Sequence, residues 1–168
     1  MDLLSAIESR SSAARLTLPG PTREDLDRLL HAAARAPDHG RLKPWRFVVL
    51  DDALRPAFAR AAAEAKRSRV PQMTEEQMAA EREKIGRSPC IVVIGCAVNR
   101  DNSKIPEIEQ VIAAGAAAQN LFLAAHDLGL GVMWKTGAAA YDPTVKALLG
   151  LRPDDHIVAI MHLGTRSK

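Results

Sequence analysis

The clearest hydrophobic pattern lies in the segment that begins at Thr22. Leu26, Leu29 and Leu30 are spaced three to four residues apart, as on one face of an amphipathic helix. Thr22 precedes this stripe and Asp25 stands three residues later, so the two residues form the pattern of a capping box. The pattern predicts a helix that ends before the proline-containing loop that follows, because a residue before proline avoids the helical conformation.

Similar signals predict five further helices. Thr74 and Gln77 form a second capping-box pattern, and a proline stands in the first turn of three other segments. The longest of these segments is rich in alanine and aliphatic residues, which predicts a long central core helix. The predicted helices cover residues 3–7, 56–67, 75–85, 106 to about 129 or 131, and 143–149.

Four apolar runs are predicted to be strands, and the strongest is Pro89–Val98. It is apolar nearly throughout, which indicates a central strand that is covered on both faces. The other three are Arg46–Asp51, Gly131–Lys135 and His156–Leu163. Helices before, between and after about four strands predict an α+β fold, a three-layer sandwich with a central, mostly antiparallel sheet. No Gly-x-Gly-x-x-Gly follows a first strand, which disfavours a Rossmann dinucleotide fold.

Composition agrees with a single folded domain over residues 1–168. Apolar residues make up 47% and charged residues 26% of the chain, as in ordinary globular proteins. Cys90 and Cys96 lie six residues apart in one apolar strand, so we expect two buried free thiols on the same face. The first residues lack the pattern of a signal peptide, and no stretch is expected to span a membrane, so we expect a cytoplasmic protein.

The net charge of +3 is small and mostly dispersed. The densest basic cluster is Lys66, Arg67 and Arg69, at the end of a predicted helix, where cations suit the helix dipole. A nucleic-acid patch is the alternative interpretation, but no aromatic residues are interleaved with these cations. We therefore expect no nucleic-acid partner and a solvated helix end.

Three polar segments are candidates for function. The first contains Arg10, Ser11, Ser12 and Arg15. Arginine forks and serine hydroxyls together could bind an anion such as a phosphate monoester. The alternative is a solvated helix terminus that serine residues cap.

The second segment is the loop that includes Arg35, His39, Lys43 and Trp45. A single loop histidine is more often a surface residue, and a tryptophan at a strand start is more often a core or interface anchor. The third segment, Trp134-Lys135-Thr136-Gly137, ends a predicted strand. It could hold a planar charged cofactor, or it could be an ordinary strand end with a solvated lysine.

Taken in order, these segments resemble the motifs of the FMN-dependent nitroreductase family. The resemblance covers Leu3 to Thr165. In particular, the chain resembles the short bacterial members of the family. No single motif is specific, but five motifs in register are. They are Arg10-Ser11-Ser12, Arg35-Ala36-Pro37-Asp38-His39 with Lys43-Pro44-Trp45-Arg46-Phe47, Leu128-Gly129-Leu130-Gly131, Trp134-Lys135-Thr136-Gly137 and Leu163-Gly164-Thr165.

The resemblance implies a homodimer that binds FMN at the subunit interface. It also implies a ping-pong reaction in which NADH or NADPH reduces the flavin and the flavin then reduces a nitroaromatic or quinone-like acceptor. Arg10, Ser11 and Ser12 would bind the phosphate and ribityl chain, and Trp134, Lys135 and Thr136 would come from the same subunit. Arg35 and His39 would reach the flavin of the partner subunit. No classical catalytic residue and no metal site is implied, since hydride passes directly to and from flavin N5.

Several positions depart from the family pattern. Ser11 stands where a second arginine is usual, and Lys43 and Lys135 replace a glutamine and an arginine. A lysine cannot form the bidentate fork of an arginine, so phosphate binding is expected to be looser or rearranged. Many relatives continue past the last strand, so a less entwined dimer is expected here, in which Arg166 and Lys168 are candidate substitutes for a basic residue of that tail.

These departures leave open an alternative, a flavin-binding dimeric module with little or no turnover. The sequence does not specify the acceptor or the preferred nicotinamide, nor whether Arg15 contacts the flavin. Residues of Val70–Gln77 and Asn99–Ile105 are expected to contribute to the acceptor pocket.

Overall fold

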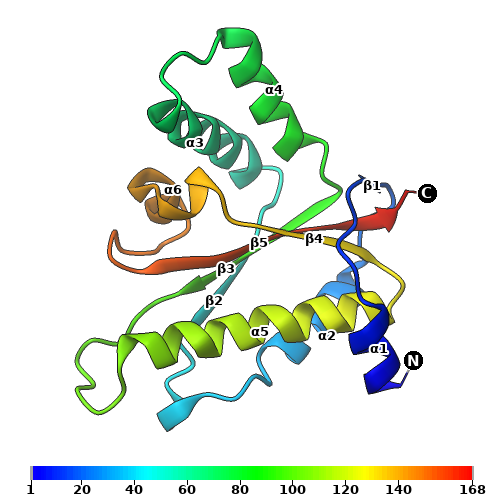
Figure 1. Ribbon diagram of the computed structural model, residues 1–168, viewed down its shortest axis with the longest axis vertical. Helices are drawn as coiled ribbons and strands as arrows, with labels where there is room; N and C mark the ends of the chain where they lie inside the picture. The colour runs from blue at the N-terminus through cyan, green and yellow to red at the C-terminus, as the bar shows by residue number, and fades with distance from the viewer. Residues whose placement is uncertain (1, 168) are drawn as a thin grey trace.

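A five-stranded sheet lies between two layers of helices in the computed structural model, which describes residues 2–167 (Figure 1). The strands are β1 (Leu16–Thr17), β2 (Trp45–Val49), β3 (Cys90–Cys96), β4 (Gly131–Lys135) and β5 (His156–Arg166). The α-helices are α1 (Leu3–Ser9), α2 (Arg23–Ala33), α3 (Leu54–Arg69), α4 (Glu75–Gly86), α5 (Glu107–Asp127) and α6 (Pro143–Leu148). Two short 3-10 helices, η1 (His39–Arg41) and η2 (Ala138–Tyr141), complete the fold.

Strand β3 forms the middle of the sheet, as its continuous apolar sequence predicts. It pairs with β2 on one side and with β5 on the other, and β5 also pairs with β4 and β1. All of these pairs are antiparallel, and every residue of β3 is buried. Val92 and Ile94 pack toward α2 and α5, whereas Ile91 and Val93 pack toward α3 and α6. The predicted α+β sandwich is therefore confirmed.

The two cysteines lie as predicted, on the same face of β3. Both thiols are free and buried, in the cluster of side chains that faces α5. Burial, together with the nearby carboxylates of Asp155 and Glu107, raises the pKa of the Cys96 thiol to about 11. The thiols are thus protonated at neutral pH and act as small apolar side chains.

Helix α5 is the long core helix that the sequence predicts. Its alanines, including Ala114, Ala117 and Ala118, are fully buried and allow close contact with the sheet and with α2. We expected that no segment would resemble a membrane span, but α5 is long and apolar enough to do so. It has 21 residues and a mean hydropathy of 1.2 over an 18-residue window. It packs as a core helix along one face of the sheet (Figure 1).

Local signals placed the starts of α2 and α4 correctly, whereas α3 (Leu54–Arg69) extends two residues beyond its predicted range at each end. Thr22 with Asp25, and Thr74 with Gln77, form reciprocal capping boxes at the starts of α2 and α4. The structure adds one strand to the four that were predicted. Strand β1 has only two residues and pairs with Thr165 and Arg166, which also extends β5 beyond its predicted end. Such a short strand has no periodicity of its own, so only the long-range pairing defines it.

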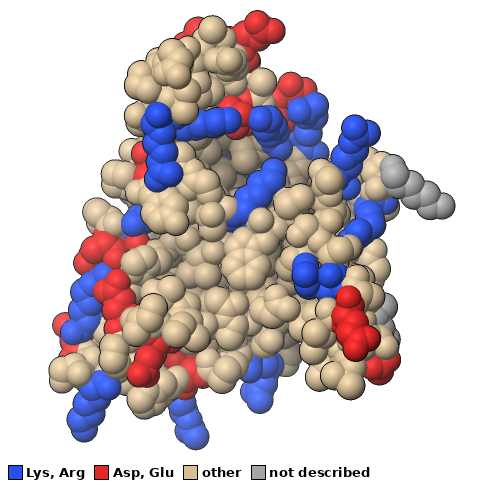
Figure 2. Space-filling view, in the orientation of Figure 1, with Lys and Arg blue, Asp and Glu red and all other residues tan. Residues whose placement is uncertain are grey.

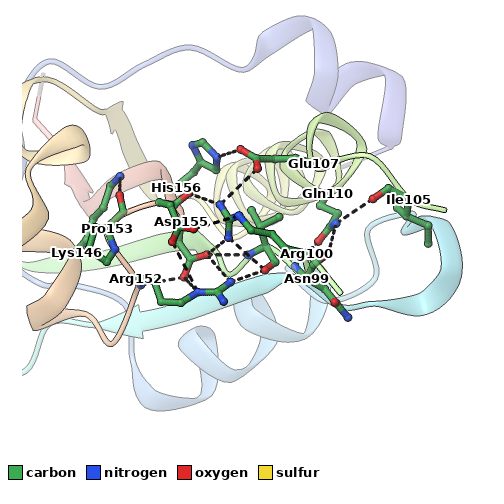
Figure 3. A network of polar contacts seen from close by, with 12 residues as sticks. Asn99, Arg100, Ile105, Glu107, Gln110, Lys146, Arg152, Pro153, Asp155 and His156 are labelled. Carbon is green, nitrogen blue, oxygen red and sulfur yellow. Dashed lines mark hydrogen bonds and ion pairs between the residues drawn. The ribbon is translucent and has the colours of Figure 1, made fainter. Parts of the chain in front are cut away.

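A polar network ties the start of β5 to the end of β3 and the start of α5 (Figure 3). At its centre the Asp155 carboxylate, which is 2% exposed, accepts hydrogen bonds from the Val98 amide, from the amide and guanidinium of Arg152, and from the Arg100 guanidinium. Burial alone would raise the pKa of Asp155, but these hydrogen bonds outweigh it and lower the pKa to about 2. The network stabilises the end of the molecule at which α5 begins.

Candidate functional site

The first polar segment leaves α1 and crosses the C-terminal half of α5. Arg10 is the C-cap residue of α1, and its guanidinium carbon lies 4.8 Å from the centroid of the Phe122 ring on α5. This is a cation–π contact, which orients the guanidinium without neutralising its charge. Arg10 therefore remains able to bind an anion.

Ser11 and Ser12 follow directly, and the structure gives them different surroundings. Arg166 of β5 donates to the Ser11 hydroxyl at 3.0 Å and to the Ser11 carbonyl at 2.7 Å. The Ser12 side chain is exposed and has no hydrogen-bond partner among residues 2–167. Arg166 thus adds a second cation to this segment, whereas Lys168 lies outside the described residues.

A glycine lets the first segment lie against the edge of β4. The Ala13 amide donates to the Val132 carbonyl at 2.8 Å. A Cβ atom on Gly131 would lie 2.6 Å from a Leu16 methyl carbon and 3.1 Å from the Ala13 Cβ. A side chain at position 131 would therefore require Leu16 and Ala13 to shift, which would loosen the contact of the first segment with the start of β4.

Replacing Gly131 by alanine is expected to lower the free energy of unfolding by about 1–3 kcal/mol, because the added methyl group overpacks this contact. Chemical denaturation measures the change. Gly86→Ala is the matched control, since a Cβ atom on Gly86 meets no atom within 4 Å. Equal stability of the two variants would contradict the argument.

The third polar segment ends β4 on the other side of this contact. The Trp134 indole donates to the Val158 carbonyl at 3.2 Å and packs against the core that faces α5. Lys135, next in the strand, points to the opposite face and is exposed. Gly137 then turns the chain with φ 64° and ψ −161°, a conformation that glycine alone adopts readily. Trp134 is therefore an anchor, and Lys135 and Thr136 are presented to solvent.

A cavity of about 550 Å³ lies between the α3–α4 pair and the sheet. This volume falls within the roughly 300–1,000 Å³ of typical ligand pockets. Figure 2 shows it as a hollow below α3 and α4, with basic side chains around it. Its walls combine the third polar segment with residues from α3, α4 and β5, among them Lys66, Arg69, Glu81, Lys84, Lys135, Thr136, Gly137 and His162.

A smaller hollow of about 110 Å³ joins this cavity to the first polar segment. Ala13 and Ala14 line it together with three residues that also line the larger cavity, Lys84, Lys135 and His162. The structure therefore brings Ala13 and Ala14 of the first segment beside Lys135 of the third, whereas Arg10, Ser11 and Ser12 line neither hollow.

His162 is a cavity residue that the sequence analysis missed. Burial, and then the charges of Lys135 and Arg55, lower its pKa to about 4, so the imidazole is neutral at physiological pH. The sequence does contain one signal, because His162 stands between Met161 and Leu163 in a run of apolar residues. Lys66 and Arg69 of α3 belong to the densest basic cluster of the sequence, which was interpreted as a solvated helix end, but the structure places them at the cavity. Lys84 of α4 gave no signal in the sequence.

The second polar segment lines neither of these two hollows. The His39 Nδ1 atom lies 2.6 Å from a carboxylate oxygen of Glu109, near the start of α5. Arg10 contacts Phe122, thirteen positions further along the same helix, which corresponds to about 20 Å. Arg35 is exposed beside a separate hollow of about 240 Å³. Within one chain, His39 therefore lies far from Arg10, and Arg35 lines a hollow that none of the other predicted site residues lines.

Trp45, by contrast, has the role of an anchor. Its side chain is buried in the core cluster, and the Pro44 carbonyl accepts a hydrogen bond of 2.8 Å from Ala97. Pro44 and Trp45 are thus scaffold, whereas Arg35 and His39 are exposed, as are Arg41 and Lys43 of the same loop.

An uncovered apolar surface lies on the outer face of α5. Ile108 and Ile112 are one turn apart, and they are 62% and 63% exposed. Helix α1 exposes three more large apolar residues, Leu3, Leu4 and Ile7. Contiguous apolar positions on a helix face indicate an interface with another protein surface.

No group of three or more histidine, cysteine, aspartate or glutamate side chains within residues 2–167 could hold a metal ion. The charged side chains of the cavity are instead mostly cations, with Glu81 as the carboxylate among them, which suits an organic anion.

Comparison with known proteins gives consistent results. Residues 7–165 match the sequence model of the nitroreductase family. YdjA of Escherichia coli (strain K12), provisionally named an NAD(P)H nitroreductase, is 34% identical over 98% of this chain and 88% of its own length. A nitroreductase-like family protein from Bacillus cereus has a TM-score of 0.81 and 26% identity, over 100% of this chain and 87% of that one. A structure from Desulfovibrio desulfuricans, a complex with FMN, shares the fold, with a TM-score of 0.76 and 24% identity over 100% and 88% of the two chains.

Proposed function

The chain belongs to the nitroreductase family, and on that premise we propose that it is an FMN-dependent NAD(P)H oxidoreductase of the cytoplasm. In one turnover, two electrons leave NAD(P)H as a hydride. With one proton they convert a nitro group to a nitroso group and water, or, without loss of water, a quinone to a hydroquinone. The observation that supports this most strongly is the cavity walled by Lys135, Thr136 and Gly137, which adjoins the first polar segment.

The donors at this place fit FMN. A phosphate monoester carries a charge near −2 at neutral pH and needs cations and short hydroxyl donors. Arg10 and the Ser12 hydroxyl meet that need in one short loop, and Arg166 is fixed beside them through Ser11. FMN, when bound, supplies the hydride chemistry, while the protein binds and orients the reactants and excludes water.

Lys135 is the group best placed to act on the charge of the flavin ring. Its side chain has no ion pair or hydrogen bond within residues 2–167, so its charge is available to a ligand. A cation there would favour the extra negative charge of a reduced flavin. The Arg15 carbonyl accepts a hydrogen bond from Ser167, but its guanidinium contacts neither cavity. Arg15 is therefore not among the residues that we propose for flavin binding.

We propose a homodimer, because within one chain His39 lies about 20 Å along α5 from Arg10 and Arg35 lines a separate hollow. A second copy packed on the outer face of α5 would cover Ile108 and Ile112 and could present its own Arg35 and His39 to the first chain. In a two-fold symmetric dimer both sites are completed in the same way.

A visible spectrum and an anaerobic titration test the proposed function. The purified protein is expected to show the visible absorbance of oxidised flavin, or to gain it on addition of FMN, and NADH or NADPH is expected to bleach it. Readmitting a nitroaromatic or quinone acceptor should restore the colour. A protein that stays colourless with excess FMN would refute the proposal.

A flavin-binding module with little turnover is the second candidate. It is favoured by Ser11, which replaces a usual cation and whose hydroxyl is already occupied by Arg166. This alternative predicts stoichiometric FMN binding with negligible NAD(P)H oxidation whichever acceptor is supplied, so the same titration distinguishes the two.

A further inference from the structure

The ionisable residues of the large cavity are mostly cationic. Lys66 and Arg69 come from α3, Lys84 from α4 and Lys135 from β4, and Glu81 is the carboxylate among the lining residues. Four cations and one carboxylate give a formal charge of +3, since His162 is neutral at physiological pH. The protein as a whole also has a net charge of +3, so its positive charge is concentrated here.

Glu81 bridges the two helices that form the mouth of the cavity. One of its oxygen atoms, Oε1, lies 2.6 Å from the Lys66 ammonium and 2.5 Å from that of Lys84. The Glu81 side chain is 21% exposed, and these two hydrogen bonds outweigh the effect of burial and lower its pKa. A single carboxylate therefore serves two ammonium groups, so one positive charge at the mouth stays uncompensated.

Lys135 also lines the cavity, and its positive charge has no counter-ion within residues 2–167. The lining further includes the apolar side chains of Ala62, Val70 and Ile85. Apolar side chains beside cations that lack enough counter-ions match a flat apolar ring that carries a negative group. Apolar surroundings also strengthen the attraction between opposite charges relative to water.

We propose that this cavity is the acceptor site and that it selects aromatic acceptors bearing a carboxylate or a similar anionic group. This inference rests on the proposed function and names its substrate class. The anionic group is held by Lys66 and Lys84 at the mouth, in competition with Glu81, and the apolar walls cover the ring. The reducible group then points toward Lys135–Gly137, where we propose that the cofactor binds.

A pair of acceptors of similar shape and different charge tests the proposal directly. For 4-nitrobenzoate and 4-nitrobenzamide, the ratio of kcat/KM values is expected to favour the anion by about tenfold at low ionic strength, corresponding to about 1.4 kcal/mol. The ratio should fall toward unity as salt screens the charges. Direct calorimetric binding of the two compounds to the FMN-loaded and the as-purified protein should show the same preference without relying on turnover.

Three variants test the residues in opposite directions. Lys66→Gln and Lys84→Gln are each expected to lower the preference for the anion about threefold, whereas Glu81→Gln should raise it by a similar factor, because it releases both lysines. Arg28→Gln removes one positive charge from the surface of α2, where Arg28 pairs with Glu24, and is expected to leave the ratio unchanged.

The outcomes separate this inference from the proposed function. If NAD(P)H bleaches the flavin but the two acceptors bind and react alike, the inference is overturned and the proposed function stands. If the lysine variants lose affinity for FMN and not for the anion, the cations serve the cofactor phosphate, which also overturns it. If the protein prefers the anion in calorimetry but shows no turnover, the cavity assignment holds and the proposed function fails.

Discussion

Replacing Asp155 by alanine is expected to lower the free energy of unfolding by about 3–5 kcal/mol, the usual cost of removing one partner of a buried ion pair. The substitution leaves the Val98 amide, the guanidinium of Arg152 and one contact of Arg100 without their acceptor (Figure 3). Urea denaturation followed by circular dichroism measures the loss. Because Asp155 lies outside the two cavities, the folded fraction is expected to keep its flavin affinity.

The neighbouring Asp154 supplies a matched control. It also faces Arg100 and Arg152, but its side chain is 58% exposed. Water screens such a pair, so Asp154→Ala is expected to cost less than about 1 kcal/mol. Similar losses from the two substitutions would show that burial of Asp155 is not what makes the network stabilising.

The same carboxylate makes stability depend on acid pH. The folded-state pKa of Asp155 is about 2, below the ordinary value of 3.8, so the unfolded chain takes up the proton first as the pH falls. The stabilisation is therefore fully present above about pH 5 and is lost as the pH falls toward 2, in total about 2.5 kcal/mol. Asp155→Asn should flatten that part of the curve of stability against pH.

Replacing Ile112 by glutamate is expected to convert the proposed dimer to a monomer. The new charge would lie in the middle of the apolar face of α5, where the partner would leave it unpaired and without water. A monomer lacks the Arg35 and His39 of a second copy, so FMN affinity should fall by about 100-fold, or about 2.8 kcal/mol. Analytical ultracentrifugation and flavin fluorescence measure the two effects.

Two controls make this test specific. Ala80→Glu places the same charge on an exposed position of α4 and is expected to change neither measurement. Mixing chains that carry Arg10→Ala with chains that carry His39→Ala should restore FMN binding in hybrid dimers, each of which has one intact site. A tight complex of FMN with monomeric Ile112→Glu would show that the site is complete within one chain.

Much of the local structure was predictable because its causes are local. The two capping boxes begin α2 and α4 as expected, since a cap needs only residues three positions apart. The apolar run of β3 identified the central strand, because a strand covered on both faces excludes polar residues at every position. Family motifs likewise identified the first and third polar segments, which the structure brings together.

The long-range features could not be read in this way. Arg166 binds Ser11 across 155 positions, and the two residues of β1 become a strand only through β5. The sequence did not specify which face of β4 packs against α5, so Trp134 could have been a ligand contact or an anchor. In the structure Trp134 packs against the core and donates to the Val158 carbonyl, so it is an anchor.

By itself, the sequence determined the α+β fold, the central strand and helix, and the segments that carry the family motifs, because periodicity and capping act between neighbours. Only the tertiary structure decided which charges meet. It placed Lys66, Lys84 and Glu81 together with Lys135 and His162 around one cavity, and it put His39 at the far end of α5 from Arg10. Such convergence depends on how the helices pack on the sheet, which no single segment specifies.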